Sequence, residues 1–161
     1  MAQENTFKLL TQCVQLDVSA LDWQDAIRKA CHPLVDGGFV KDGYSEDVIS
    51  REMQWATGLP TTPAGVAIPH ALKPDNVVDE QIAACRLASP VKFAQSGGSA
   101  QDEAIDVSLL FILALKDSQA QLHLLQKLMI AISDEAMLTA LLRASAPSDF
   151  SNIFNSAASA T

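Results

Sequence analysis

The chain has 161 residues, 48% of them hydrophobic, which suits one globular domain with its own core and excludes a disordered chain. Its 11 basic residues are outnumbered by 19 acidic ones, and the net charge of −8 leaves no basic surface for nucleic acid. Three cysteines without C-x-x-C spacing and three histidines without H-E-x-x-H spacing exclude a disulfide framework and give no support for a metal site.

The N-terminal part of the chain predicts one strand and two helices. A strand is expected near Cys13–Leu16, followed by a helix over Asp22–Val35, where apolar residues recur at helical spacing. Pro33 should disturb the last turn of that helix. After a link at Phe39–Tyr44, Ser45 is a good N-cap for a second helix that runs to about Trp55.

The middle of the chain predicts the rest of a sheet. Short apolar strands are expected at Val66–Ile68 and Ile82–Leu87, with an extension at Val91–Phe93. A polar, glycine-bearing loop spans 94–104. Ile105–Leu115 is the strongest strand candidate, because it is apolar enough to lie at the centre of a sheet that is covered on both faces.

The C-terminal part predicts helices only. We expect a long helix over Ser118–Ile132, a shorter one from about Asp134 to Arg143, and a last turn or two over Pro147–Phe154. Residues 155–161 should form a flexible tail. Strands that alternate with helices predict an α/β fold, a single domain whose sheet carries helices on both faces.

Membrane insertion and secretion are not expected. The longest strongly apolar run, Leu109–Leu115, is too short to span a bilayer, and the N-terminus does not resemble a signal peptide. These features predict a cytoplasmic protein.

The segment TGLPTTPAGVAIPHA, residues 57–71, holds the main candidate for chemistry. Its His70 follows a proline that restricts the backbone, and a neutral imidazole can attack phosphorus. Gly58 allows a ligand to approach the backbone, Thr57 offers a hydroxyl, and the guanidinium of Arg51 on the preceding helix suits phosphate oxygens. On these residues alone, an ordinary structural histidine in a loop rich in turn residues remains the simpler interpretation.

A resemblance to a known family favours the chemical interpretation. Arg51-Glu52, then TGLPT at 57–61, then GVAIPH at 65–70, resembles the active-site signature of EIIA domains in the fructose–mannitol superfamily of the bacterial sugar phosphotransferase system. The form of the motif is most similar to the galactitol-type branch. The resemblance extends over residues 6–154, which we therefore assign to one EIIA domain.

This resemblance implies a fold and a function. The fold would be a three-layer αβα sandwich with a mixed sheet. His70 would accept a phosphoryl group from the phosphohistidine of HPr and pass it to a cysteine of EIIB, which phosphorylates a sugar taken up through EIIC. Arg51 would stabilise the phosphoryl charge, with Thr57 and Gly58 in the phosphate loop, and neither a metal nor another cofactor is implied.

One position departs from the family pattern. Many relatives have a second active-site histidine where this chain has Gln121, in the segment QLHLL. At helical spacing Gln121 falls on the apolar side of its helix, whereas His123 points almost oppositely, so His123 should face solvent. Gln121 can donate a hydrogen bond to a phosphoryl oxygen or to His70, but it carries no charge.

Several alternatives stay open at this point. The chain could be a regulatory EIIA-like module whose phosphorylation controls the binding of a transporter or regulator. An EIIB domain is excluded, because Cys13 lies in an apparent strand rather than in a phosphate-accepting loop. The sequence does not name the sugar, the oligomeric state or the ring nitrogen that is phosphorylated. An apolar surface around residues 59–68 is a candidate docking face.

Overall fold

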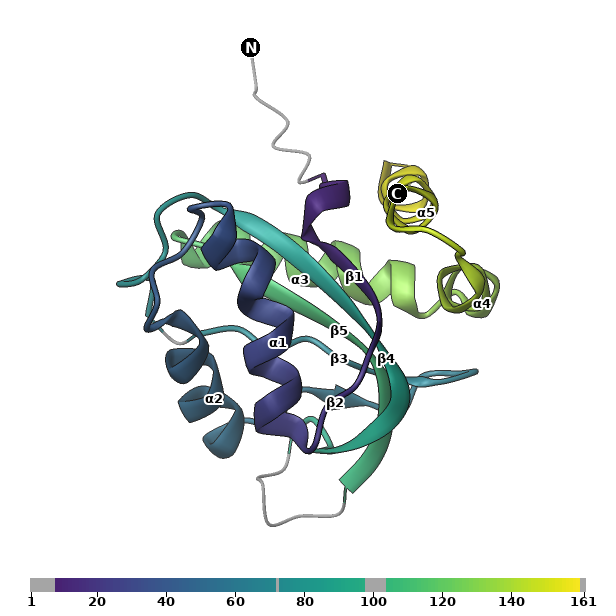
Figure 1. Cartoon of the computed structure of the whole chain (residues 1–161), viewed down its shortest axis with the longest axis horizontal. Coiled ribbons are helices and arrows are strands. Elements are labelled where there is room, and N and C mark those ends of the chain that lie inside the picture. The colour runs from purple at the N-terminus through teal and green to yellow at the C-terminus, as the bar shows by residue number, and fades with distance from the viewer. Residues whose placement is uncertain (1–7, 72, 98–103, 160–161) are drawn as a thin grey trace.

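A computed structural model describes residues 8–71, 73–97 and 104–159 of the protein. Its sheet contains β1 (Val14–Val18), β2 (Gly58–Leu59), β3 (Gly65–Ala67), β4 (Gln81–Ala94) and β5 (Ala104–Ala114) in the order β1-β4-β5-β3-β2 (Figure 1). The β1–β4 and β3–β5 pairs are parallel, whereas β4–β5 and β2–β3 are antiparallel. The sheet is therefore mixed.

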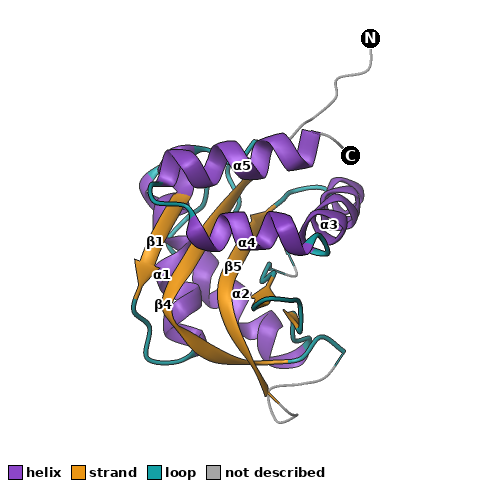
Figure 2. Ribbon diagram, turned by 90° about the vertical axis from the view of Figure 1, so that its right-hand side faces the viewer, coloured by secondary structure: helices purple, strands orange, loops and turns teal. Residues whose placement is uncertain are grey.

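Helices cover both faces of this sheet. α1 (Trp23–Asp36) and α2 (Tyr44–Gln54) lie on one side, and α3 (Ser118–Ile132), α4 (Glu135–Arg143) and α5 (Pro147–Ser159) lie on the other (Figures 1 and 2). The predicted class, a single-domain αβα sandwich with a mixed sheet, is confirmed. Within the described residues, no helix combines the length and the apolar character needed to cross a bilayer.

Aromatic side chains join the layers. On one face Trp23 of α1 meets Phe93 of β4, with ring centroids 6.4 Å apart. From the centre of the sheet, Phe111 of β5 packs against Phe150 and Phe154 of α5 at 6.4 and 5.2 Å. Each ring of this kind removes a large apolar area from water, so these contacts hold the helices against the sheet.

β5 is the central strand, as its apolar sequence predicted. Its residues from Leu109 to Ala114 are all buried, and it pairs with β4 on one side and β3 on the other. β4 is one continuous strand that includes both the predicted strand at Ile82–Leu87 and its predicted extension at Val91–Phe93. Its pairing with β5 shifts register between Arg86 and Val91. Within that stretch Ala88, Ser89 and Pro90 are exposed, which places Pro90 at a bulge, where a proline is tolerated.

Two helix ends differ from the sequence prediction. α2 begins at Tyr44 rather than at Ser45, and no side chain caps it. α5 extends to Ser159, although helical structure was expected to end near Phe154. Tertiary contact explains this extension, because the amide of Asn155 accepts from the Leu9 N–H at 2.8 Å and donates to the Leu9 carbonyl at 3.0 Å.

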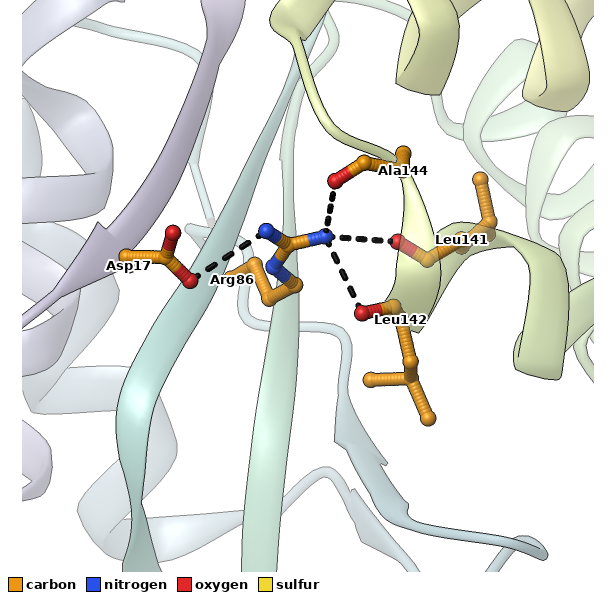
Figure 3. Close-up of polar contacts among 5 residues, drawn as sticks. All are labelled: Asp17, Arg86, Leu141, Leu142 and Ala144. Atoms are coloured by element: carbon orange, nitrogen blue, oxygen red, sulfur yellow. Dashed lines mark hydrogen bonds and ion pairs between the residues drawn. The ribbon is translucent and has the colours of Figure 1, made fainter.

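Arg86 joins α4 to the sheet. Its side chain is 10% exposed, and Nη1 donates to the carbonyls of Leu141, Leu142 and Ala144 at 3.1, 3.1 and 2.8 Å (Figure 3). These carbonyls lie at the C-terminal end of α4, where a helix runs out of its own N–H donors, although that of Leu141 also accepts from the Ala144 N–H at 3.4 Å. Nη2 donates to Asp17 at 3.2 Å. One buried cation therefore satisfies a helix end and fixes the position of α4.

Replacement of Arg86 by Met should destabilise the protein by about 2–4 kcal/mol, because three carbonyls lose a charged donor. The control is Asp17→Asn, which removes only an exposed ion-pair partner and suits the positive φ of 57° at that position. We expect this control to cost less than about 1 kcal/mol. Urea unfolding measures both values, and equal losses in the two variants would contradict the assignment to the helix carbonyls.

Candidate active site

His70 lies where two parallel strands end. It follows β3 after Ile68 and Pro69, and it forms an isolated parallel bridge with Leu113 near the end of β5. The Leu113 N–H donates to the Pro69 carbonyl at 3.2 Å. The carboxyl ends of parallel strands are where open α/β sheets place their ligands, so the histidine occupies a position suited to chemistry.

A hydrogen bond fixes the His70 ring. Nδ1 lies 2.9 Å from the carbonyl oxygen of Ile68. A carbonyl can only accept, so Nδ1 carries the proton and, in the neutral ring, the lone pair is on Nε2. This geometry leaves Nε2 as the nucleophilic nitrogen.

Burial keeps the His70 ring neutral. The residue is 5% exposed, and this burial lowers its pKa from the ordinary 6.5 to about 4. The hydrogen bond to Ile68 works against the decrease, and the positive charge of Arg51 adds to it. At neutral pH the imidazole is therefore unprotonated on Nε2 and able to attack an electrophile.

Arg51 lies in the last turn of α2 and is half-buried. Its guanidinium carbon lies 5.9 Å from the centre of the Trp55 ring, and Nη1 donates to the Trp55 carbonyl at 3.5 Å. Burial lowers the pKa of Arg51, although the Glu52 charge opposes this. Among the described residues, no carboxylate forms an ion pair with Arg51, so its other N–H donors remain available to an anion.

Glu52 and Thr57 form a buried pair behind the histidine. The Glu52 carboxylate accepts from the Thr57 N–H and from the Thr57 hydroxyl, both at 2.8 Å. The Thr57 oxygen in turn accepts from the N–H of Ile68 at 3.2 Å. Burial raises the pKa of Glu52, and the two Thr57 bonds oppose that rise. The Thr57 hydroxyl thus already holds two internal partners.

Gly58 serves the packing of the loop. A Cβ atom there would lie 2.5 Å from the carbonyl oxygen of Ala94, so no larger residue fits. The Gly58 carbonyl accepts from Ser96 at 2.7 Å, and Gly58 pairs with Ala67 as part of β2. The segment around Gly58 is therefore built into the edge of the sheet.

Tyr44 supports the His70 segment from the other side. Its hydroxyl donates to the Leu113 carbonyl at 2.6 Å and also meets the backbone of Ala71. The sequence analysis placed Tyr44 in a link and gave no role to it or to Glu52. Tyr44 is the first residue of α2, and nothing in the local sequence indicates that its hydroxyl reaches the backbone near His70.

The remaining histidines lie apart from this arrangement. His123 is exposed on α3, as its helical spacing predicted. Gln121 belongs to the same helix, but its side chain lies outside the part of the chain that the structure describes. On α3 the buried apolar side includes Leu124 and Leu128, whereas Leu122 is 58% exposed. Among the described residues, no group of three His, Cys, Asp or Glu side chains could hold a metal ion.

Comparison with known proteins identifies the family. Residues 8–157 match the family described as "Phosphoenolpyruvate-dependent sugar phosphotransferase system, EIIA 2". The chain therefore belongs to the EIIA type 2 family, whose members are components of a phosphotransferase system.

Individual relatives agree with this assignment. SgcA of Escherichia coli (strain K12), by name a phosphotransferase IIA component, is 29% identical over 132 residues, 82% of this chain and 87% of SgcA. The structure of enzyme IIAMtl in its complex with phosphorylated enzyme IIBMtl from Escherichia coli gives a TM-score of 0.77 at 23% identity, over 93% of this chain and 99% of that one. The nitrogen regulatory protein IIA-Ntr of Neisseria meningitidis gives 0.69 at 24% identity, over 90% and 94%.

Acid should destabilise the native protein through His70. Because its folded pKa of about 4 lies below the unfolded value of 6.5, the unfolded chain binds more protons between these pH values, so stability falls as the pH decreases from about 6.5 to 4. Relative to His70→Gln, the wild type should lose at most about 1.4 kcal/mol per pH unit. Urea unfolding between pH 7 and 4.5 measures the difference. Glu52 is present in both proteins, so its own titration cancels, and a constant difference would contradict burial of a neutral ring.

Proposed function

We propose that the protein is a phosphocarrier that takes a phosphoryl group from HPr on Nε2 of His70 and delivers it to a cysteine of EIIB. The observation that carries the proposal is the buried, neutral His70 ring, whose Nδ1–H is bound to the Ile68 carbonyl. This arrangement presents one defined lone pair for in-line attack on phosphorus. Membership of the EIIA type 2 family supports the same chemistry.

The two transfers balance in electrons and protons. The Nε2 lone pair forms the new N–P bond while the N–P bond of the HPr phosphohistidine breaks, and the released electron pair stays on the HPr imidazole. The phosphorylated His70 ring is then an imidazolium, in which Nδ1 keeps its proton and donates it in the hydrogen bond to the Ile68 carbonyl. When the EIIB thiolate attacks phosphorus, the N–P electron pair returns to Nε2 and restores the neutral ring.

Arg51 would neutralise the charge of the transferred group. Three equatorial oxygens share the negative charge during transfer, and a guanidinium can bind two of them at once. Its charge already acts on His70 in the resting protein, because it lowers the pKa of that ring. Gly58 backbone and Gln121 are candidate hydrogen-bond donors to the same group, whereas Thr57 suits an indirect role.

Partner docking would use the end of α2. The sequence pointed to residues 59–68, but Val66, Ala67 and Ile68 are buried and offer no apolar surface. Next to Arg51, Met53 and Trp55 are 48% and 50% exposed. A small apolar area next to Arg51 suits a transient contact with HPr and then EIIB.

Transport is our preferred role, and the galactitol-like motif makes a galactitol-type EIIB the first acceptor to test. The regulatory alternative would use the same His70 chemistry without a dedicated EIIB. Transfer of the labelled phosphoryl group from the protein to a purified EIIB supports a role in sugar transport. Stable label in the presence of EIIB proteins favours the regulatory role.

Incubation with phosphoenolpyruvate, enzyme I and HPr should label the wild type with acid-labile, base-stable phosphate. His70→Ala should take no label, and Arg51→Ala should be labelled about 100-fold more slowly, because one stabilising cation is lost. His123→Ala, which removes an exposed histidine, should be labelled like the wild type. Quench-flow with radiolabelled phosphoenolpyruvate measures these rates.

Two results would contradict the proposed function. One is an unlabelled wild-type protein in a mixture that labels a known EIIA. The other is label that survives in His70→Ala and disappears from His123→Ala.

A further inference from the structure

Glu52 is a buried carboxylate beside the reacting histidine with no direct contact to it. It is 4% exposed, it follows Arg51 on α2, and both of its oxygens accept hydrogen bonds from Thr57. Burial of a carboxylate costs free energy that hydrogen bonds only partly offset. A purely apolar contact would hold the end of α2 to the segment around Thr57 without the free-energy cost of a buried charge. The presence of a carboxylate therefore needs a further explanation.

We propose that Glu52 is a positioning residue that, through the Thr57 hydroxyl and the backbone of Ile68, selects the His70 tautomer with the proton on Nδ1 and the lone pair on Nε2. This inference rests on the proposed phosphocarrier function, and it adds a role for two residues that do not touch the phosphoryl group.

The contacts form one continuous chain. The Thr57 hydroxyl donates a hydrogen bond to the Glu52 carboxylate at 2.8 Å and accepts one from the Ile68 N–H at 3.2 Å. The carbonyl of the same residue, Ile68, accepts from Nδ1 of His70 at 2.9 Å. Ile68 is thus held at its N–H by Thr57, and its carbonyl holds the ring.

The charge of Glu52 sets the direction of these bonds. A carboxylate only accepts, so both Thr57 donors must point to it, and the Thr57 oxygen must turn a lone pair toward Ile68. A neutral amide in the same place would offer one acceptor and one donor group. The hydroxyl could then reverse, and the Ile68 backbone would lose its fixed partner. In the low-dielectric interior such a chain gains strength from each bond in it.

The consequence for catalysis is geometric. If Ile68 moves, its carbonyl no longer defines which ring nitrogen carries the proton, and a fraction of His70 adopts the form with the proton on Nε2. That form has no lone pair on Nε2 and cannot attack phosphorus from that nitrogen. Misplacement of a reacting group by about 1 Å can reduce a rate by about 100-fold.

The key variant is Thr57→Val, which removes the hydroxyl and keeps the shape of the side chain. We expect the ¹⁵N spectrum of the unphosphorylated His70 ring to show a mixture of tautomers. Transfer from phosphorylated HPr should be about 10- to 100-fold slower. Thr57→Ser, which restores the hydroxyl, should recover a single Nδ1–H form and most of the rate. Thr139→Val makes the same chemical change at a solvent-facing hydroxyl on α4 and should alter neither the spectrum nor the rate.

Glu52→Gln is the second variant, in case Thr57→Val does not fold. It should broaden the tautomer distribution and slow transfer, with thermal unfolding used to verify the fold. A single Nδ1–H tautomer with wild-type rates in a folded Thr57→Val or Glu52→Gln protein would overturn the proposal. So would a slower rate with an unchanged ring spectrum, because that result assigns the pair a structural role only.

The ¹⁵N spectrum of His70 tests whether Glu52 and Thr57 select the tautomer, and the transfer assay tests the phosphocarrier function, so the two hypotheses can fail separately. If HPr does not label the wild type, the proposed function fails. The ring spectrum of the unphosphorylated protein still decides whether Glu52 and Thr57 select the tautomer.

Discussion

The parallel bridge between His70 and Leu113 is the contact on which the whole site depends. β5 is the buried central strand, so the segment that pairs with its end is held by the most rigid part of the molecule. The Pro69 carbonyl accepts from Leu113, and the Tyr44 hydroxyl binds the Leu113 carbonyl. A loop histidine thereby gains the positional precision of a strand residue, which the phosphoryl transfer proposed for it would require.

The site combines two buried titratable groups, His70 and Glu52, with the half-buried Arg51, and their pKa values are displaced in complementary ways. Burial lowers the pKa of His70 and of Arg51 and raises that of Glu52. The result at neutral pH is a neutral nucleophile beside a cation, with a carboxylate that is satisfied by hydrogen bonds rather than by an ion pair. An anion that enters this site meets positive charge that no described carboxylate neutralises, which is the electrostatic arrangement that phosphoryl transfer uses.

The sequence predicted the positions of His70 and Arg51 in the fold more accurately than the ends of the elements around them. The order and spacing of Arg51, TGLPT and GVAIPH were enough to place His70 at the end of a strand and Arg51 on the preceding helix. The sequence did not predict the two-residue β2, and it separated the two parts of β4 at the bulge. It also placed the end of α5 too early, because the hydrogen bonds from Asn155 to Leu9 join residues 146 positions apart. It also gave no role to Glu52 or Tyr44, since nothing local to either residue shows that its polar atoms reach the backbone around His70.

The sequence by itself determined the class of fold, the buried central strand and the identity of the candidate nucleophile, because these follow from apolar patterning and from a family motif confined to residues 51–70. Only the tertiary structure decided which nitrogen of His70 is free, how far its pKa falls, and which side chains hold it. Those properties depend on distances between α2, β3 and β5, and such distances are set by packing between segments that are remote in the chain.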